Sequence, residues 1–222
     1  MESFLRYRDA HHPQWVVAAY ALAPPAFQKL LAEELAWLQR LVQPPLVEVG
    51  CGAGRILAAL GVQGGSVVGL DLVPRYLVAA RRLNVPAWWV AGDGLRPPLR
   101  RNHWRTVIFG QATLGSLGSE PLRRRMLTSL AELVAPGGRL LVTAYGPQAR
   151  QARREWYEAQ QRAGLLPPFD PARTREGTFA FTNGFVSQEL TAHELQAHCP
   201  QGLVGAVTEL PSGLLAASWR RV

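Results

Sequence analysis

Apolar residues recur along residues 25–146 at two spacings that alternate. Residues 25–41 carry leucine or phenylalanine every three or four positions, which predicts an amphipathic helix. Short apolar runs come next, and helical spacing returns between them. This alternation is typical of a doubly wound, mostly parallel α/β sheet with helices on both faces. We expect strands at 46–50, 66–72, 86–93, 106–111 and 139–145, and helices at 55–63, 74–84 and, with its stop signals, 120–138.

The pattern changes after residue 146. A polar helix is predicted at 148–162, followed by a proline-rich loop and the aromatic stretch GTFAFTNGF. Thr191 and Glu194 form a capping-box signature that predicts one more helix. Residues 203–222 contain two apolar runs around a Pro-Ser-Gly turn, which predicts an antiparallel hairpin.

We therefore expect one domain over residues 1–222, built on a Rossmann-like seven-stranded sheet that the antiparallel hairpin closes. Its predicted parts are N-terminal cap helices at 1–43, a ligand-binding core at 44–146, an excursion or lid at 147–200 and the closing hairpin at 201–222.

The composition fits a globular protein. Hydrophobic residues make up 48% of the 222 residues and charged residues 18%, which is enough apolar material for a full core. No apolar run reaches the roughly 18 residues that span a bilayer, and the charged start lacks the apolar segment of an export signal. Cys51 and Cys199 fit neither a disulfide nor a metal pattern, so we expect reduced thiols in a cytoplasmic protein.

The chain is basic. Its net charge is +8, and Lys29 is the only lysine among 24 basic residues. A basic surface attracts polyanions. The arginine clusters, however, are scattered and are not interleaved with aromatic residues. We interpret them mainly as solvated helix faces and helix ends, and we keep nucleic acid as a less favoured partner.

Acids stand at the ends of three successive predicted strands: Glu48, Asp71 and Asp93. Ligands of open α/β sheets bind outside the carboxyl ends of the strands, where these acids would meet. Three glycines at alternate positions follow Glu48, and Asp71 comes 17 residues after Gly54, close to the spacing at which an acid reaches a ribose diol. The pattern therefore predicts a ligand that contains a nucleoside.

The glycine loop disfavours the dinucleotides. A nicotinamide dinucleotide needs Gly-x-Gly-x-x-Gly, and Arg55 stands where the third glycine belongs. A Gly-Lys-Ser/Thr phosphate loop is absent from the sequence. Glu48, two residues before the first glycine, would repel a pyrophosphate but suits a ligand with an ammonium and a sulfonium group. We therefore set a nicotinamide-dependent oxidoreductase aside.

Four segments resemble the motifs of the class I S-adenosylmethionine-dependent methyltransferases, of the type that acts on small molecules. VEVGCGAG is similar to the first motif of the family, and VVGLDLVPRYLVAAR to its second. NVPAWWVAGDGLRPPL and LAELVAPGGRLLVTAY resemble the third-strand segment and the turn into the fifth strand. The resemblance covers residues 44–146 well and 190–222 moderately. It implies S-adenosylmethionine as the cofactor and S-adenosylhomocysteine as the product.

The resemblance also implies roles for single residues. Glu48 would order the methionyl amino group, Asp71 would accept both ribose hydroxyls and Leu72 would pack on the adenine ring. Asp93 would accept the adenine amino group, and the Gly94 amide would face the ring. The remaining implied cofactor residues lie in the glycine loop or at the end of the fourth strand: Gly50, Cys51, Gly52, Gly54, Phe109, Gly110 and Gln111.

The acceptor site is predicted less firmly. Tyr20 resembles the N-terminal tyrosine that many small-molecule members place over the site, and Tyr145, Trp156 and His193 are weaker candidates for substrate contacts. Methyl transfer needs mainly alignment and exclusion of water, so a general base is optional and no catalytic residue or metal ligand is predicted.

Several acceptor classes are disfavoured by the residues after the predicted fourth strand. GQATLGSLG replaces the Asn/Asp-Pro-Pro-aromatic motif of enzymes that methylate base amines, and it offers neither a Pro-Cys nucleophile nor an Asp-Asn pair for Mg²⁺. We expect methyl transfer to a small molecule. The alternatives are an RNA or ribosome-associated methyltransferase and a non-catalytic relative that only binds the cofactor.

Overall fold

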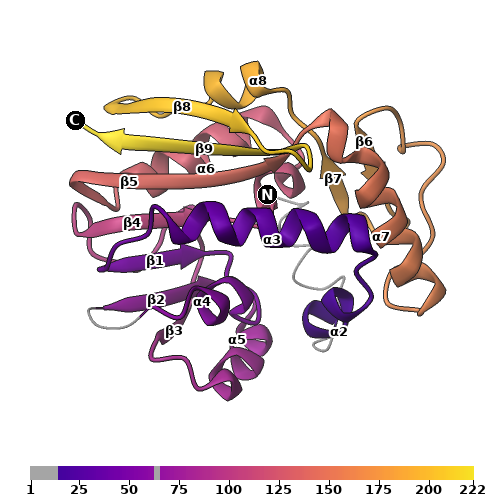
Figure 1. Cartoon of the computed structure of the whole chain (residues 1–222), viewed down its shortest axis with the longest axis horizontal. Helices are drawn as coiled ribbons and strands as arrows, with labels where there is room; N and C mark the ends of the chain where they lie inside the picture. Colours follow the sequence, from indigo (N-terminus) through magenta and orange to yellow (C-terminus); the bar gives the residue numbers. More distant parts are fainter. Residues whose placement is uncertain (1–14, 63–65) are drawn as a thin grey trace.

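A seven-stranded sheet forms the centre of the molecule. The computed structural model describes residues 15–62 and 66–222. The strand order is β3-β2-β1-β4-β5-β9-β8; β1 to β5 pair in parallel, and β9 pairs antiparallel with both β5 and β8 (Figure 1). This confirms the predicted doubly wound sheet and its closing hairpin. The strands are β1 (Leu46–Val49), β2 (Val67–Asp71), β3 (Trp88–Ala91), β4 (Trp104–Phe109), β5 (Val134–Tyr145), β8 (Leu203–Glu209) and β9 (Leu214–Arg221).

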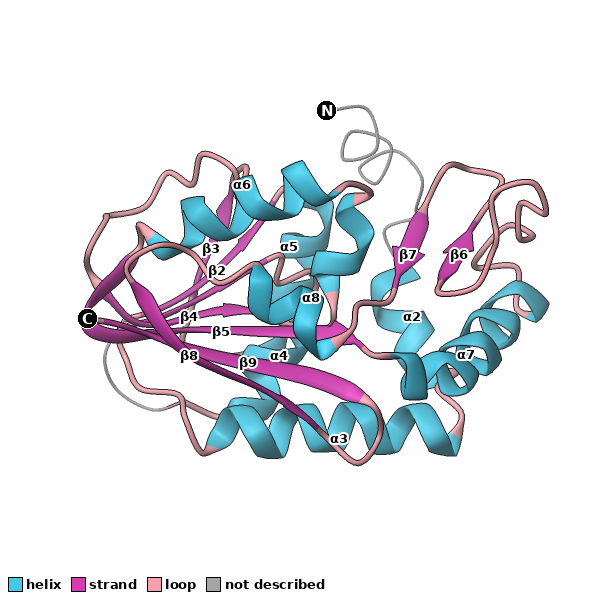
Figure 2. Ribbon diagram, turned by 90° about the horizontal axis from the view of Figure 1, so that it is seen from above, coloured by secondary structure: helices cyan, strands magenta, loops and turns pink. Residues whose placement is uncertain are grey.

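Helices cover both faces of this sheet, and each face has its own apolar core. Helices α3 (Pro25–Gln39), α4 (Arg55–Leu60) and α5 (Pro74–Ala80) pack on one face, where Phe27, Ile56 and Tyr76 join one cluster. Helices α6 (Glu120–Ala131) and α8 (Ala192–Ala197) pack on the other, where Leu127 and Leu195 join a second cluster (Figure 2). The strands alternate their side chains between the two clusters, as a sheet buried on both faces requires.

Several element boundaries differ from the prediction. Helix α4 ends before Gly61, which has φ 57°, so the predicted end at residue 63 is too late. Gly64 and Gly65, which follow that predicted helix in the sequence, lie outside the described residues. Helix α6 ends at Ala131, before the predicted end at residue 138. Helix α5 gives way after Ala80 to a 3-10 turn, η1 (Arg81–Leu83). Strand β5 begins at Val134 and not at the predicted residue 139. Val134 already pairs with Trp104, and a register irregularity follows this pair.

The excursion lies beyond the carboxyl ends of the parallel strands, close to α2 (Trp15–Ala21) (Figure 1). It contains a short 3-10 turn η3 (Pro147–Ala149), helix α7 (Arg150–Arg162) and a two-stranded sheet of β6 (Thr178–Ala180) and β7 (Val186–Gln188). The aromatic stretch seen in the sequence forms β6 and the turn that leads to β7, and its phenylalanines Phe179 and Phe181 meet the ring of Tyr157 edge-on. None of the helices in the described parts of the chain is long and apolar enough to cross a bilayer.

Candidate functional site

The glycine loop after β1 explains why three glycines stand at alternate positions. Gly50, Gly52 and Gly54 have φ values of 73°, 53° and 79°, in the left-handed region that other residues enter at a cost. A side chain at position 54 is also excluded by packing, because a β-carbon there would lie 2.5 Å from the ring of Trp89. The loop therefore turns back on itself and directs backbone N–H groups toward the carboxyl ends of β1 and β2.

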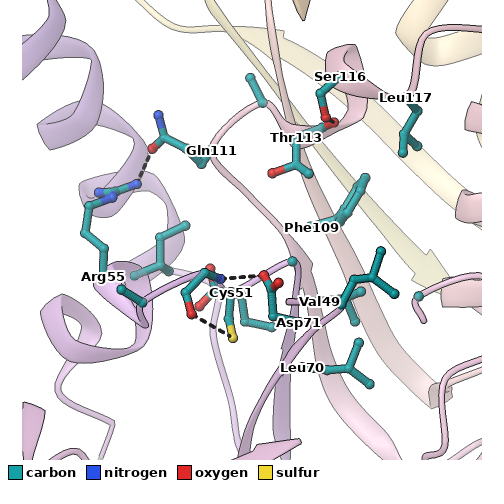
Figure 3. A pocket seen from close by; sticks show the side chains of 18 of the residues that line it. Val49, Cys51, Arg55, Leu70, Asp71, Phe109, Gln111, Thr113, Ser116 and Leu117 are labelled. Atoms are coloured by element: carbon teal, nitrogen blue, oxygen red, sulfur yellow. Dashed lines mark hydrogen bonds between the residues drawn. The ribbon is translucent and has the colours of Figure 1, made fainter. Parts of the chain in front are cut away.

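Asp71, at the end of β2, is held against this loop. One carboxylate oxygen accepts a hydrogen bond from the Gly52 N–H at 2.7 Å (Figure 3). The other accepts one from the Val73 N–H at 2.8 Å. Burial raises the pKa of Asp71, and these two N–H donors oppose that rise. Each oxygen retains acceptor capacity, so the carboxylate is fixed in place and still able to bind a pair of hydroxyls.

Glu48 carries the most perturbed carboxyl of the cavity. It is 3% exposed, and its Oε2 atom has no hydrogen-bond partner among the described residues. Burial raises the pKa of Glu48 to about 8; Arg55 lowers it, while Glu34 and Asp71 raise it further. The carboxyl is therefore mainly protonated at neutral pH. A buried acid in this state is suited to a positively charged ligand, whose arrival would favour the ionised form.

A third acid, Glu34 on α3, connects several elements on the other side of the cavity. It is fully buried, and its Oε1 accepts hydrogen bonds from the Gln111 N–H (2.6 Å) and from the Thr143 hydroxyl (2.7 Å). Its Oε2 pairs with Arg55 Nη2 at 2.7 Å, and Arg55 also donates to the side-chain oxygen of Gln111 (Figure 3). Gln111 and Ala112 have φ values of 53° and 50°, a strained conformation for residues with a side chain, and the Glu34 contacts hold it.

The cavity continues from this network to an aromatic end under the excursion. Tyr20 comes from α2, Tyr145 from the end of β5, Trp156 and Tyr157 from α7, and Phe185 from the turn before β7. Asp71 and Gly52 line the same cavity at its opposite end. One continuous cavity thus has a glycine-and-acid end at the strand tips and an aromatic end beneath the excursion.

The structure brings most of the predicted site residues to this cavity, but not all. Asp93 does not line it, and its Oδ1 accepts the Leu95 N–H at 2.8 Å. Gly54 packs against Trp89, and a β-carbon on Gly110 would lie 2.5 Å from Ile56. His193 is exposed on α8 and lies outside the cavity lining, so it is not placed at the site. The predicted residues that line the cavity are Tyr20, Glu48, Gly50, Cys51, Gly52, Asp71, Leu72, Gly94, Phe109, Gln111, Tyr145 and Trp156.

Sequence reasoning missed several residues of the site. Glu34 had a readable signal, because it lies on the apolar face of its helix, four positions after Leu30. Arg55 was considered only as a missing glycine. Three further lining residues, Tyr157, Phe185 and Ser187, come from the excursion, whose fold no motif specified.

Comparison with protein families finds a match to a family described as a methyltransferase domain, over residues 46–138. Two curated bacterial proteins are similar in sequence. The biotin biosynthesis bifunctional protein BioHC of Cellvibrio japonicus is 28% identical over 115 residues, which is 51% of this chain and 22% of that protein. The bifunctional protein BioCD of Bordetella avium is 28% identical over 159 residues, or 62% of this chain and 32% of that protein. The matches thus span a third or less of each relative.

Solved structures share the fold. The DhpI–SAM–HEP complex superposes with a TM-score of 0.65 at 19% identity, covering 99% of this chain and 96% of that one. SAM-bound CalS10, an amino pentose methyltransferase from Micromonospora echinaspora, superposes with a TM-score of 0.59 at 19% identity, covering 93% and 96%.

Replacement of Glu34 by glutamine is expected to destabilise the protein by about 3 kcal/mol, because it leaves Arg55 without its charge partner and disturbs the Gln111 contact. For a chain of this length, that corresponds to a fall in Tm of about 6–12 °C, measured by scanning calorimetry. Glu158→Gln, which removes only a surface partner of Arg154 at 3.8 Å, is the matched control and should leave Tm nearly unchanged. Equal Tm values for both variants would contradict the role given to Glu34.

Replacement of Glu48 by glutamine should change how stability depends on pH. Because the pKa of Glu48 is about 8 in the folded protein and about 4.5 when the group is exposed, folding binds a proton between these values. The stability that this bound proton gives the folded protein is complete below pH 4.5 and is lost as pH rises toward 8. As pH rises from 5 to 8, the difference between the Tm of Glu48→Gln and the Tm of the wild type should therefore change in favour of the variant. Parallel Tm curves in thermal unfolding at several pH values would refute a perturbed Glu48.

Proposed function

We propose that this chain is a class I S-adenosylmethionine-dependent methyltransferase, which transfers the methyl group of S-adenosylmethionine to a small-molecule acceptor by in-line displacement. The observation that carries the proposal is one continuous cavity. It joins Glu48, Asp71 and the glycine loop to an aromatic end that is lined by five rings. A methyl donor at one end and an acceptor at the other would then meet near Gln111.

The residues present fit the cofactor. The fixed carboxylate of Asp71 suits the two ribose hydroxyls, and the unpartnered Oε2 of Glu48 supplies a buried acceptor for an ammonium group. Gly94 borders the cavity where a β-carbon would lie 2.9 Å from Val49, so the wall stays flat there. When bound, the cofactor supplies a methyl group that a positively charged sulfur has already activated.

The residues of the chain contribute alignment and exclusion of water. The Glu34–Arg55–Gln111 network fixes the loop after β4 at the junction between the two ends of the cavity. The excursion covers the aromatic end, where Trp156 and Tyr157 are 5% and 2% exposed. Alignment of this kind lowers the barrier of a two-reactant step by up to about 7–11 kcal/mol in the best cases. This contribution does not require a base from the protein.

A small acceptor is favoured over RNA by the shape and charge of the site. The aromatic end lies under α7 and the β6–β7 sheet, and the two arginines beside it are paired with Glu34 and Glu189. A polynucleotide would need an open channel with unpaired basic groups along it. The chain's charge of +8 resides in arginines distributed along the whole sequence.

Replacement of Asp71 by asparagine is expected to weaken binding of S-adenosylhomocysteine about tenfold or more, because the ribose diol loses an ionic acceptor inside a buried site. Isothermal titration calorimetry measures this. Asp170→Asn, a carboxylate on the excursion loop that does not line the cavity, serves as the matched control. Unchanged affinity in a folded Asp71→Asn variant would remove Asp71 from the cofactor site.

Binding of S-adenosylmethionine at pH 7 should release about one proton, because a cationic ligand beside Glu48 brings its pKa of about 8 below the solution pH. Affinity should accordingly rise as pH increases from 6 to 8. Titrations in two buffers of different ionisation enthalpy measure the proton count. Glu48→Gln should abolish the release; if that variant releases the same number of protons, another group is responsible.

A further inference from the structure

The aromatic end of the cavity is a rigid chamber, which we call the acceptor chamber and define by Tyr20, Tyr145, Trp156, Tyr157, Phe185 and Ser187. Trp156 is fixed at its centre: its Nε1 donates to the Ala19 carbonyl at 2.8 Å, and its ring stacks on Phe27 with a centroid distance of 4.0 Å. Tyr20 and Tyr157 stack beside it at 5.8 Å and 5.5 Å. Rings held in this way favour a flat, apolar ligand that is bound without rearrangement.

The chamber is poorly suited to a cationic ligand. An aromatic wall ordinarily attracts a cation, but the guanidinium of Arg55 already lies 5.0 Å from the ring centre of Tyr20, and that of Arg153 lies 4.5 Å from the ring centre of Tyr145. A cationic acceptor would therefore find these two ring faces already occupied by a guanidinium group. Its desolvation would not be offset.

An anionic acceptor is no better served. Each guanidinium has its own carboxylate: Arg55 pairs with Glu34 at 2.7 Å, and the fully buried Arg153 pairs with Glu189 at 3.3 Å. A second contact, between Arg150 and Glu189, ties this acid to the start of α7. Because both positive charges are compensated within the protein, neither is left to stabilise a buried negative charge on the ligand.

A hydrogen-bond donor remains available in the chamber. Ser187 Oγ lies 2.8 Å from the Tyr157 hydroxyl and accepts a hydrogen bond from Arg153 Nη2 at 3.0 Å. The Tyr157 hydroxyl donates its hydrogen to Ser187 Oγ, so the Ser187 hydroxyl hydrogen is available to a ligand. Both residues line the cavity and are 3% and 2% exposed. A ligand atom that accepts this hydrogen bond would be strongly oriented.

We infer that the acceptor is an uncharged, flat aromatic molecule with a hydrogen-bond-accepting atom, which receives the free hydroxyl hydrogen of the Ser187–Tyr157 pair. This rests on the proposed function and narrows its substrate class. The ring would lie among Tyr20, Trp156 and Tyr157, and the accepting atom would point toward β7. That orientation would leave the opposite edge of the ring toward Gln111 and the methyl donor. An oxygen, nitrogen or sulfur atom at that edge would form the new bond to the methyl carbon as the carbon–sulfur bond breaks and neutral S-adenosylhomocysteine leaves, and the proton of that atom would pass to water.

A matched set of naphthalene probes tests the charge preference. Binding is measured by calorimetry on the full chain saturated with S-adenosylhomocysteine. We expect 2-acetylnaphthalene to bind about tenfold or more tightly than the naphthalene-2-carboxylate anion and the 2-(aminomethyl)naphthalene cation, because charged groups pay a larger desolvation cost in the chamber. Equal or tighter binding of either charged probe would overturn the inference.

Variants of the donor pair test the hydrogen bond. Ser187→Ala should weaken 2-acetylnaphthalene about fivefold to tenfold. Naphthalene, which has no accepting atom, should bind the variant as it binds the wild type, which shows that the chamber is intact. Tyr157→Phe is the second variant; it leaves the Ser187 hydroxyl hydrogen in place, because Tyr157 is the donor to Ser187 Oγ, and should keep the affinity for 2-acetylnaphthalene within about twofold. Ser218→Ala, on β9 and outside the cavity lining, is the control.

The outcomes separate the two levels of the proposal. If the wild type does not bind S-adenosylhomocysteine, the proposed function itself fails. If it binds S-adenosylhomocysteine but 2-acetylnaphthalene has no advantage over the charged probes, or keeps full affinity in Ser187→Ala, only the inferred acceptor class is overturned. Loss of the ketone probe in Ser187→Ala, with the affinity for naphthalene unchanged, supports the inference.

Discussion

The buried carboxylate of Glu34 is the interaction on which the site depends most. It connects helix α3, the first residue of α4, the loop after β4 and strand β5 through Arg55, Gln111 and Thr143. A charge at zero exposure is costly unless every lone pair is used, and here three donors share the two oxygens. The same contacts hold Gln111 and Ala112 in a left-handed backbone conformation at the junction of the two ends of the cavity. The stability of the fold and the geometry of the site therefore both depend on the Glu34 carboxylate.

The acids of the site differ in state because their surroundings differ. Asp71 receives two backbone N–H donors, which oppose the effect of burial on its pKa. Glu48 has an oxygen without a partner in the described part of the chain, and burial keeps it mainly protonated at neutral pH. Glu34 is compensated by Arg55. Asp71 is thus held by backbone donors, Glu48 has a raised pKa and an unpartnered oxygen, and Glu34 holds Arg55 and the loop after β4. Such a division arises from local donors and burial rather than from residue type.

Much of the core could be predicted from the sequence, because its signals are local. Gly50, Gly52 and Gly54, whose alternate spacing was noted in the sequence, have positive φ values, and Asp71 ends its strand facing the loop. Glu34 was missed because an acid in an amphipathic helix is usually taken as solvent-facing, although its position placed it on the apolar face. The excursion was harder. Phe185 and Ser187 reach the cavity through a small sheet whose pairing no short motif encodes, and His193, which was expected there, lies on the exposed side of α8.

The chamber draws four of its six residues, Trp156, Tyr157, Phe185 and Ser187, from one uninterrupted stretch between β5 and α8. The glycine loop, Glu48 and Asp71 lie in a different part of the chain, within its amino-terminal half. Under the proposed function, recognition of the acceptor and binding of the nucleoside would therefore come from separate parts of the chain. Exchanging residues 150–188 for the corresponding stretch of another protein of the same fold would then change the acceptor while leaving the strand-end acids as they are.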